Sequence, residues 1–426
     1  MVFNLKTKKI AAALLLRMEF YFDTAQNQRT CPLLDDLSWI HCGISRCIKN
    51  VKSGRDFLQS LRSATDGKFN ISRQHWKESL DSKRRLSHIE SINKHYLEDQ
   101  SHEALKNNPT GLTKEFEKFH IFSADGHFHG ASAHESRDEK GRKHAIGHLY
   151  AMNMRNQLVS HLALSSDGSR KKPHDMGTLK KMEIDILRQG AKKGERVLYV
   201  WDRACIDFPQ WMKWKQQNGI YFLTRTKENM EKSVMGNLPY DKKSASNSGV
   251  ISNQLISGSF GYTLRMITYE DLETGVTYEF ITNLPNSIEP GIIVQLYRMR
   301  WDIEKVFDEF KNKFEETKAW AKGLVAKKMQ AAFIVMSYNL LREFQREIEE
   351  KMGIEDEENA KKRKDRWEKT LECYEAKGVE IPEWLIKLRR ATQIGVKFIR
   401  WVRSRLFSES PWDLSMELLR YEYSQK

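Results

Sequence analysis

One polar stripe near residue 300 combines the residue types that phosphodiester chemistry requires. The segment LYRMRWDIEKVFDEFKNK contains Tyr297, Arg300, Glu304 and Lys311, the last three at offsets of 3, 7 and 14 from the tyrosine. Each helical residue advances about 100°, so these positions fall within roughly 60° of one another. A carboxylate there can hold a divalent metal, and the cations can hold phosphates. The alternative is an ordinary i,i+4 ion pair between Arg300 and Glu304 on a surface helix.

The same segment predicts one continuous helix with a buried face and a solvent face. The predicted core positions are Ile303, Val306, Phe307, Phe310 and Phe314. The predicted solvent positions are Asp302, Lys305, Glu309 and Asn312. The stripe therefore borders the core.

Two aspartates are expected to complete a metal site with Glu304. Asp125 ends the apolar strand FHIFSAD, and Asp202 ends the uninterrupted run VLYVWD. Strand ends commonly build sites in α/β sheets, and burying two aspartates without cations is costly. Three carboxylates suit two ions about 3.5 to 4 Å apart. Asp207 and Asp175 are alternative candidates for the second aspartate ligand. Asp202 is favoured because it directly follows the strand VLYVW.

A run of histidines follows the first aspartate. It consists of His127, His129, His134, His144 and His148. A metal site is one interpretation, but the run lacks the paired ligand spacing typical of zinc motifs. We therefore expect most of these side chains to be exposed or structural.

Composition limits the function classes. The 426 residues carry a net charge of +14 and are 40% hydrophobic, which predicts two or three packed domains that attract nucleic acid. The longest apolar run, Ile10 to Leu16, is far shorter than the roughly 20 residues of a membrane span. The five cysteines contain no CxxC pair, which favours free thiols in the cytosol.

The pattern of elements predicts an α/β sheet between helical ends. Short apolar strands are expected at FHIFSAD, HAIGHLYAM, QLVSHLAL, VLYVWD and YFLTRTK, with helices at GTLKKMEIDILRQG and ACIDFPQWMKWKQQNG. The segment from 228 to about 287 is first rich in Ser, Gly and Asn and then alternates between apolar and polar residues. This pattern predicts a β insertion. Basic residues of the helical ends are candidate phosphate contacts, among them Arg84, Arg85, Lys327, Lys328, Arg389 and Arg390.

Three segments together resemble the DDE transposases of the bacterial insertion-sequence-four family, with its Tyr-Arg-Glu-Lys signature. The first is Asp125-Gly126, and the second is Asp202-Arg203 followed by Gly219 and YFLTRTK. The third is FITNLP followed by the signature helix with all four positions at the family spacing. The resemblance covers about 116 to 345. Ala204 and Cys205 follow Asp202-Arg203, where several relatives have Gly and Tyr.

The resemblance implies an α/β fold with a ribonuclease-H-like catalytic core, a β-rich insertion, and helical N-terminal and C-terminal regions. The expected division is a DNA-binding region at 1–115, the first part of the core at 116–227, the insertion at 228–287, the second part with the catalytic glutamate helix at 288–345, and a helical region for DNA contact or oligomerisation at 346–426.

The resemblance also implies roles for the site residues. Asp125, Asp202 and Glu304 would be catalytic and would bind two Mg²⁺ or Mn²⁺ ions. Phosphates of the element's end would be held by Tyr297, Arg300 and Lys311. Trp301, beside the stripe, is the best candidate for stacking on an unpaired or flipped base.

The implied reaction is hydrolytic cleavage at the ends of an insertion sequence, followed by attack of the new 3′-hydroxyl on target DNA. The partners would be double-stranded DNA, both the terminal inverted repeats and the target, bound by a homodimer on paired ends, with no membrane. The place of action would be the cytoplasm, at the bacterial nucleoid. The alternatives are a metal-dependent DNA nuclease without joining activity and an inactive, transposon-derived DNA-binding protein.

Overall fold

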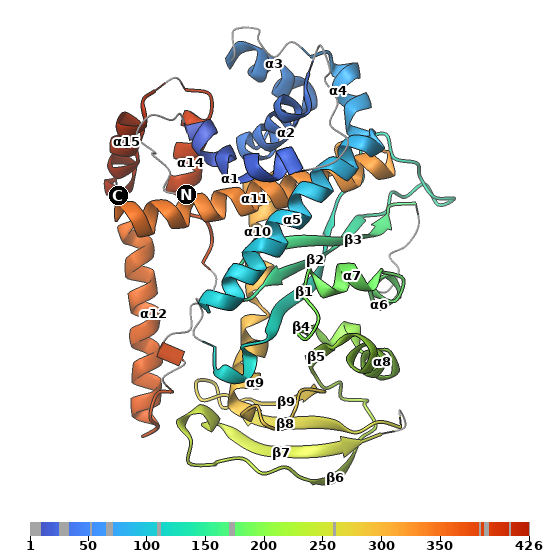
Figure 1. Cartoon of the computed structure of the whole chain (residues 1–426), viewed down its shortest axis with the longest axis vertical. Helices are drawn as coiled ribbons and strands as arrows, with labels where there is room; N and C mark the ends of the chain where they lie inside the picture. Colours follow the sequence, from blue (N-terminus) through green and yellow to red (C-terminus); the bar gives the residue numbers. More distant parts are fainter. Residues whose placement is uncertain are drawn as a thin grey trace.

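A mixed sheet runs through the molecule, with helices from both ends of the chain packed at one end of it (Figure 1). The structure is a computed structural model, and it describes residues 10–24, 34–51, 53–64, 71–108, 112–169, 175–258, 261–382, 385–386, 392–408 and 410–425. Within these ranges the sheet has nine strands in the order β3-β2-β1-β4-β5-β9-β8-β7-β6.

The strands are β1 (Phe119–His129), β2 (Ile146–Asn153), β3 (Val159–Asp167), β4 (Arg196–Val200), β5 (Ile220–Arg225), β6 (Ser233–Asn237), β7 (Val250–Ser257), β8 (Leu264–Glu270) and β9 (Thr277–Thr282). β1 is parallel to β4, and β4 is parallel to β5, whereas the other neighbours are antiparallel. The apolar run of β4 is explained by its central place, because such a strand is buried on both faces.

The predicted strands are all present, but the prediction that the first one ends at Asp125 is wrong. β1 continues through Asp125 to His129. Its pairing with β4 stops at Ser123↔Val200, whereas its pairing with β2 continues to His129↔Ile146. β2 therefore keeps β1 extended beyond the point where β4 has ended.

The predicted β insertion contains β6 to β9, and it extends the sheet. β9 pairs antiparallel with β5, in the register Leu223↔Thr282. The backbone hydrogen bonds of β5 are thus satisfied on both sides, by β4 and by β9.

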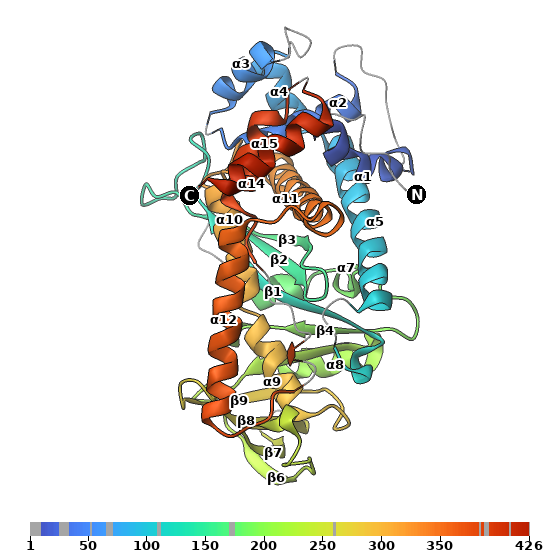
Figure 2. The same ribbon diagram turned by 90° about the vertical axis from the view of Figure 1, so that its left-hand side faces the viewer.

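The helices before the sheet are α1 (Ile10–Thr24), α2 (Asp36–Lys49), α3 (Gly54–Ala64), α4 (Arg73–Leu80) and α5 (Lys83–Asn107). Those after β3 are α6 (Asp175–Leu179), α7 (Ile184–Arg188), α8 (Phe208–Asn218), α9 (Pro290–Met299), α10 (Asp302–Lys313), α11 (Leu324–Met352), α12 (Glu357–Ala376), α14 (Val396–Arg405) and α15 (Trp412–Ser424). The helices of both ends share one hydrophobic core with α10, α11 and part of β2. Figure 2 shows α12 running down to the β8–β9 end, where Cys373 Sγ lies 3.6 Å from the Leu272 carbonyl oxygen.

Two predicted helices are divided in the structure. The segment GTLKKMEIDILRQG forms α6 and α7, separated by a turn in which Glu183 has an extended backbone. The second division, between α9 and α10, falls in the candidate site. By contrast, α8 ends as predicted, with Gly219 at a φ of 64° as its left-handed cap.

Several candidate phosphate contacts are used inside the protein instead. Arg84 and Arg85 both bind the buried carboxylate of Asp36. Lys327 is buried and lies 3.0 Å from Glu135 Oε2. Arg389 and Arg390 lie outside the described residues. In the described ranges, Cys42, Cys47, Cys205 and Cys373 are free thiols, and none of the helices is long and apolar enough to span a bilayer.

Candidate active site

The two aspartates lie next to each other where the parallel pairing of β1 and β4 ends, Asp125 within β1 and Asp202 just after β4. The last β1–β4 pair is Ser123↔Val200, and Asp125 and Asp202 each follow it by two residues. Asp202 caps the short 3-10 helix Arg203–Cys205, accepting a 2.7 Å hydrogen bond from the Ala204 N–H. Parallel strands lie about 4.8 Å apart, so this register brings the two carboxylates together.

The predicted single helix that carries the stripe is wrong, because the segment turns at Arg300-Trp301. The Ile303 N–H bonds the Arg300 carbonyl and the Glu304 N–H bonds the Trp301 carbonyl, both i→i−3 bonds of a tightened turn. The turn arises because the two halves of the segment pack in different hydrophobic cores. α9 buries its apolar side with β5, β8 and β9, whereas α10 buries its own in the helical core.

The predicted faces of α10 are half right. The five predicted core residues are all buried. Asp302 and Glu309, predicted to face solvent, are buried too. Asp302 pairs with Lys305 at 2.7 Å, and Glu309 pairs with Lys313 at 2.9 Å while accepting a hydrogen bond from the Ile394 N–H. The C-terminal segment thus covers a face that the helix alone would expose.

Arg300 connects two of the three candidate carboxylates. Its Nη1 lies 3.0 Å from Asp125 Oδ2, and its Nη2 lies 3.4 Å from Glu304 Oε1. The side chain is only 8% exposed. The i,i+4 pair with Glu304 therefore exists, but it is one side of a mostly buried bridge to a residue of β1. Such a bridge differs from an ordinary surface pair.

The pKa of Asp125 is raised to about 6, mainly because the carboxyl group is buried. The Arg300 guanidinium and the 2.7 Å hydrogen bond from the Gly126 N–H both act to lower it. The charges of Asp202 and Glu304 make smaller contributions that raise it. All three carboxylates therefore act on one another across a small, partly buried space, an arrangement that favours a bound cation.

Uptake of a divalent ion by the metal-free protein near pH 6 is expected to release a proton from Asp125. The folded-state pKa, about 6, lies above the ordinary 3.8, so the folded chain binds this proton more tightly than the unfolded chain. That contribution to stability is present at low pH and is lost as pH rises from 3.8 to 6. Titration calorimetry with Mn²⁺ in two buffers of different ionisation enthalpy measures the proton. Equal release by Asp125→Asn would contradict this assignment.

The other stripe residues surround the bridge. Tyr297 is half-buried with its ring 5.0 Å from that of Phe280, and burial raises its pKa. Lys311 is exposed about two turns beyond Glu304, on the same side of α10. Trp301 is 58% exposed at the turn itself, next to Arg300.

The residues considered as alternatives to Asp202 and Trp301 lie elsewhere in the structure. Asp207 caps α8 by accepting from the Gln210 N–H at 3.0 Å, and it binds Lys180. Asp175 packs against Gly126, where an added Cβ would be 3.0 Å from its Oδ2, and this position faces the side of β1 opposite to that of Asp125. Among the other tryptophans considered for stacking, Trp211 and Trp214 are buried in the core and Trp320 packs under Arg46.

Arg225 is a site residue that the sequence analysis did not single out. It ends β5, the neighbour of β4, which Asp202 follows by two residues, and its charge acts to lower the pKa of Tyr297 against the larger effect of burial. Its guanidinium also lies 4.5 Å from the ring centroid of Tyr278. The sequence could have indicated Arg225, because it lies at the carboxyl end of the predicted strand YFLTRTK, where site residues of α/β sheets gather.

The comparison with known families agrees with this geometry. A family model described as "Transposase DDE domain" matches residues 103–340, more than half of the chain. The matched range includes Asp125, Asp202 and Glu304. No curated protein matches the chain.

Proposed function

This chain belongs to the transposase DDE domain family, and we propose that it is an active DNA transposase of the insertion-sequence-four class. The observation that carries the proposal is the Arg300 bridge, which connects Asp125 of β1 to Glu304 of α10 beside Asp202. The order β3-β2-β1-β4-β5, with only β2 antiparallel to its neighbours, supports a ribonuclease-H-like core interrupted after β5 by β6 to β9.

The three carboxylates fit a pair of Mg²⁺ or Mn²⁺ ions. Hard oxygen ligands suit these ions, and the pKa of Asp125, raised mainly by burial and to a smaller extent by Asp202 and Glu304, is consistent with carboxylates gathered in a partly buried space. Bound ions would supply activation of the attacking oxygen and stabilisation of the leaving oxygen. In the metal-free protein Arg300 provides the nearby positive charge.

The cationic residues would position the DNA backbone. Arg300 can exchange its carboxylate partners for a phosphate, because its guanidinium forms bidentate pairs with either group. Tyr297 and Lys311 would hold neighbouring phosphates on the same side. The exposed ring of Trp301 would stack on a base that has left the duplex.

The proposed reaction has two steps. Water attacks a phosphorus at the end of the element, and the 3′-oxygen leaves as a hydroxyl. That 3′-hydroxyl then attacks a target phosphodiester, forming a new bond and releasing a 3′-hydroxyl of the target. Two chains on paired ends would carry out both steps in concert. The net charge of +14 supports binding to DNA.

A cleavage assay tests the proposal. A labelled duplex carries the inverted repeat that borders the chain's own coding sequence, and the protein is added with Mg²⁺, with Mn²⁺ or with a chelator. We expect a nick that leaves a 3′-hydroxyl at the repeat, in either metal and not in chelator. Binding without cleavage in both metals would favour the inactive DNA-binding alternative.

Lys311→Ala is expected to weaken DNA binding at every sequence and to reduce the salt dependence of binding. A lost phosphate contact reduces the slope of log K against log salt by about 1. Fluorescence anisotropy across a salt series measures the slope. Lys311→Arg keeps the charge and should keep the slope. An unchanged slope in Lys311→Ala would remove this residue from the DNA interface.

A further inference from the structure

The face of β1 that carries Asp125 continues into a buried histidine cluster. His127 and His129 follow at alternate positions, so they lie on the same face of the strand. His127 is opposite His148 of β2, and Tyr150 of β2 is opposite His161 of β3. We expected most of the histidine run to be exposed or structural; His134 is exposed, whereas His127, His129 and His148 are buried in the sheet region.

The hydrogen bonds of the cluster limit which ring nitrogens can carry protons. His148 Nδ1 and His161 Nε2 lie 2.9 Å apart, so one of them donates to the other. His129 Nδ1 donates to the Gly130 carbonyl at 3.1 Å. Neutral His129 therefore has a lone pair on Nε2, and so does neutral His148 when its Nδ1 is the donor to His161. Both Nε2 atoms are buried, and neither has a hydrogen-bond partner among the described residues.

A buried carboxylate faces these two nitrogens. Glu316 is 0% exposed, its Oε1 accepts from the Tyr150 hydroxyl at 3.0 Å, and its Oε2 lies 3.1 Å from His127 Nε2. A carboxylate oxygen of Glu316 and one nitrogen each of His129 and His148 all lie within 4.8 Å of one another. Ligands of a tetrahedral zinc ion are about 3.4 Å apart, so small side-chain movements suffice.

The environment of these groups is compatible with a bound cation. Burial acts to raise the pKa of Glu316, but the contacts with His127 and Tyr150 act against it, and the pKa lies below the ordinary value. Burial lowers the pKa of His129 and His148, because it disfavours the charged form of each ring. The neighbouring ammonium of Lys327 is held elsewhere, by Glu135 at 3.0 Å and by the Asp167 carbonyl at 2.6 Å.

We propose that His129, His148 and Glu316 form a buried zinc site with three protein ligands, which leaves the fourth tetrahedral position to a water molecule. Two imidazole nitrogens and a carboxylate suit Zn²⁺, whereas Mg²⁺ prefers oxygen ligands alone. The bonds from His129 to Gly130 and from His148 to His161 are the outer contacts that orient metal-binding histidines in proteins. The site is separate from the three carboxylates of the candidate active site.

The position of this site gives it a structural role. The segment after α10 is tied to the end of β1 by bonds from the Gly130 N–H to the Thr317 carbonyl and from the Ala319 N–H to the Gly130 carbonyl. A zinc ion would add a bond between Glu316 in this segment and the β1–β2 pair. It would thereby fix α10, which carries Glu304, against β1, which carries Asp125.

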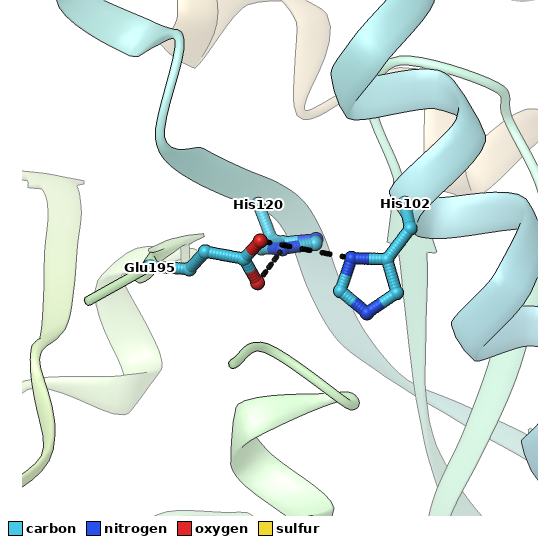
Figure 3. A group of neighbouring side chains, drawn as sticks. All are labelled: His102, His120 and Glu195. Atoms are coloured by element: carbon cyan, nitrogen blue, oxygen red, sulfur yellow. Dashed lines mark hydrogen bonds and ion pairs between the residues drawn. The ribbon is translucent and has the colours of Figure 1, made fainter. Parts of the chain in front are cut away.

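A second group of similar composition serves as a comparison (Figure 3). His102, His120 and Glu195 lie together at the opposite end of β1, and two of them are partly exposed. Both ring nitrogens of His120 are already engaged, one by Ser101 Oγ at 2.8 Å and the other by Glu195 Oε2 at 3.0 Å. Since its own hydrogen bonds satisfy this group, we expect it to bind no zinc.

The test is the zinc content of the untagged full-length chain. Each protein is incubated with Zn²⁺, desalted in the presence of Mg²⁺ and analysed for metal, and its melting temperature is recorded with and without a strong chelator. Wild type, His102→Gln and Glu304→Gln should each keep about one zinc ion per chain and lose stability in chelator. Glu316→Gln and His148→Gln should keep none.

Replacement of Zn²⁺ by Co²⁺ in the wild type covers the case in which these variants do not fold. The proposal predicts the visible bands of tetrahedral Co²⁺ with nitrogen and oxygen ligands. It is overturned if the wild type retains no zinc and shows no such bands, if folded Glu316→Gln retains zinc, or if zinc is lost in His102→Gln or Glu304→Gln.

Discussion

Glu304→Gln is expected to slow metal-dependent DNA cleavage by about 10³-fold or more while leaving DNA binding intact. The substitution keeps the shape of the side chain but removes the negative charge that would hold a divalent ion. Metal ions supply several kcal/mol of transition-state stabilisation, and each 1.36 kcal/mol corresponds to a tenfold change in rate. Single-turnover cleavage of the end-labelled duplex measures the rate, and anisotropy measures binding.

Asp308→Asn is the matched control for this prediction. Asp308 is one turn beyond Glu304 on α10, exposed, and hydrogen-bonded to Asn312 at 2.7 Å. Its loss of charge should leave the rate within a factor of about two, as expected for a surface change. Asp125→Asn and Asp202→Asn should behave as Glu304→Gln does. Cleavage by Glu304→Gln at the wild-type rate would exclude Glu304 from the metal site.

Phe310→Ala is expected to lower the free energy of unfolding by about 3–5 kcal/mol. Phe310 is 0% exposed, and its ring lies 5.3 Å from that of Tyr150 and 5.6 Å from that of Tyr338. Removing it leaves a cavity under α10, so the helix that carries Glu304 loses ring contacts with Tyr150 of β2 and Tyr338 of α11. Urea unfolding followed by circular dichroism measures the change, and cleavage should fall with it.

Trp301→Ala is the comparison for that experiment, because Trp301 is large, aromatic and 58% exposed. Its unfolding free energy should stay within about 0.5 kcal/mol of wild type. A similar loss of stability in both variants would mean that α10 is not seated as the structure shows.

The sequence predicted Asp202 well and Asp125 less well, for a physical reason. Val197 to Val200 form an apolar run that is buried on both faces, and such a run ends where the strand ends. Asp125 lies inside a longer strand, because β2 continues to pair with β1 after β4 has stopped. That length depends on partners 17 to 23 residues away, from His129↔Ile146 to Gly126↔Leu149, and no pattern within β1 reveals it.

The turn at Arg300 could not be read from periodicity. The apolar spacing of α9 and α10 continues across the turn, and only the change from one hydrophobic core to the other separates them. The burial of Glu309 likewise depends on a tertiary contact, because its partner Ile394 is 85 residues away in the sequence. Tertiary contacts of this kind override local spacing.

The histidine cluster carried a partial signal in the sequence. His127 and His129 alternate along a strand, which places them on one face. The strand register brings His148 and His161 to that face. Glu316 belongs to a segment that follows the β insertion in the sequence. Ligands this dispersed have no spacing motif, so the run alone could not identify the site.

The most direct test of the central claim is a joining assay. A pre-nicked duplex with a labelled 3′-hydroxyl at the terminal repeat is incubated with a supercoiled plasmid, the wild-type chain and Mg²⁺. A transposase should link the label covalently to the plasmid, with no product from Glu304→Gln. If the wild type cuts the uncut duplex but never joins the labelled end to the plasmid, in Mg²⁺ or Mn²⁺, the chain is a metal-dependent nuclease and the transposase assignment is wrong.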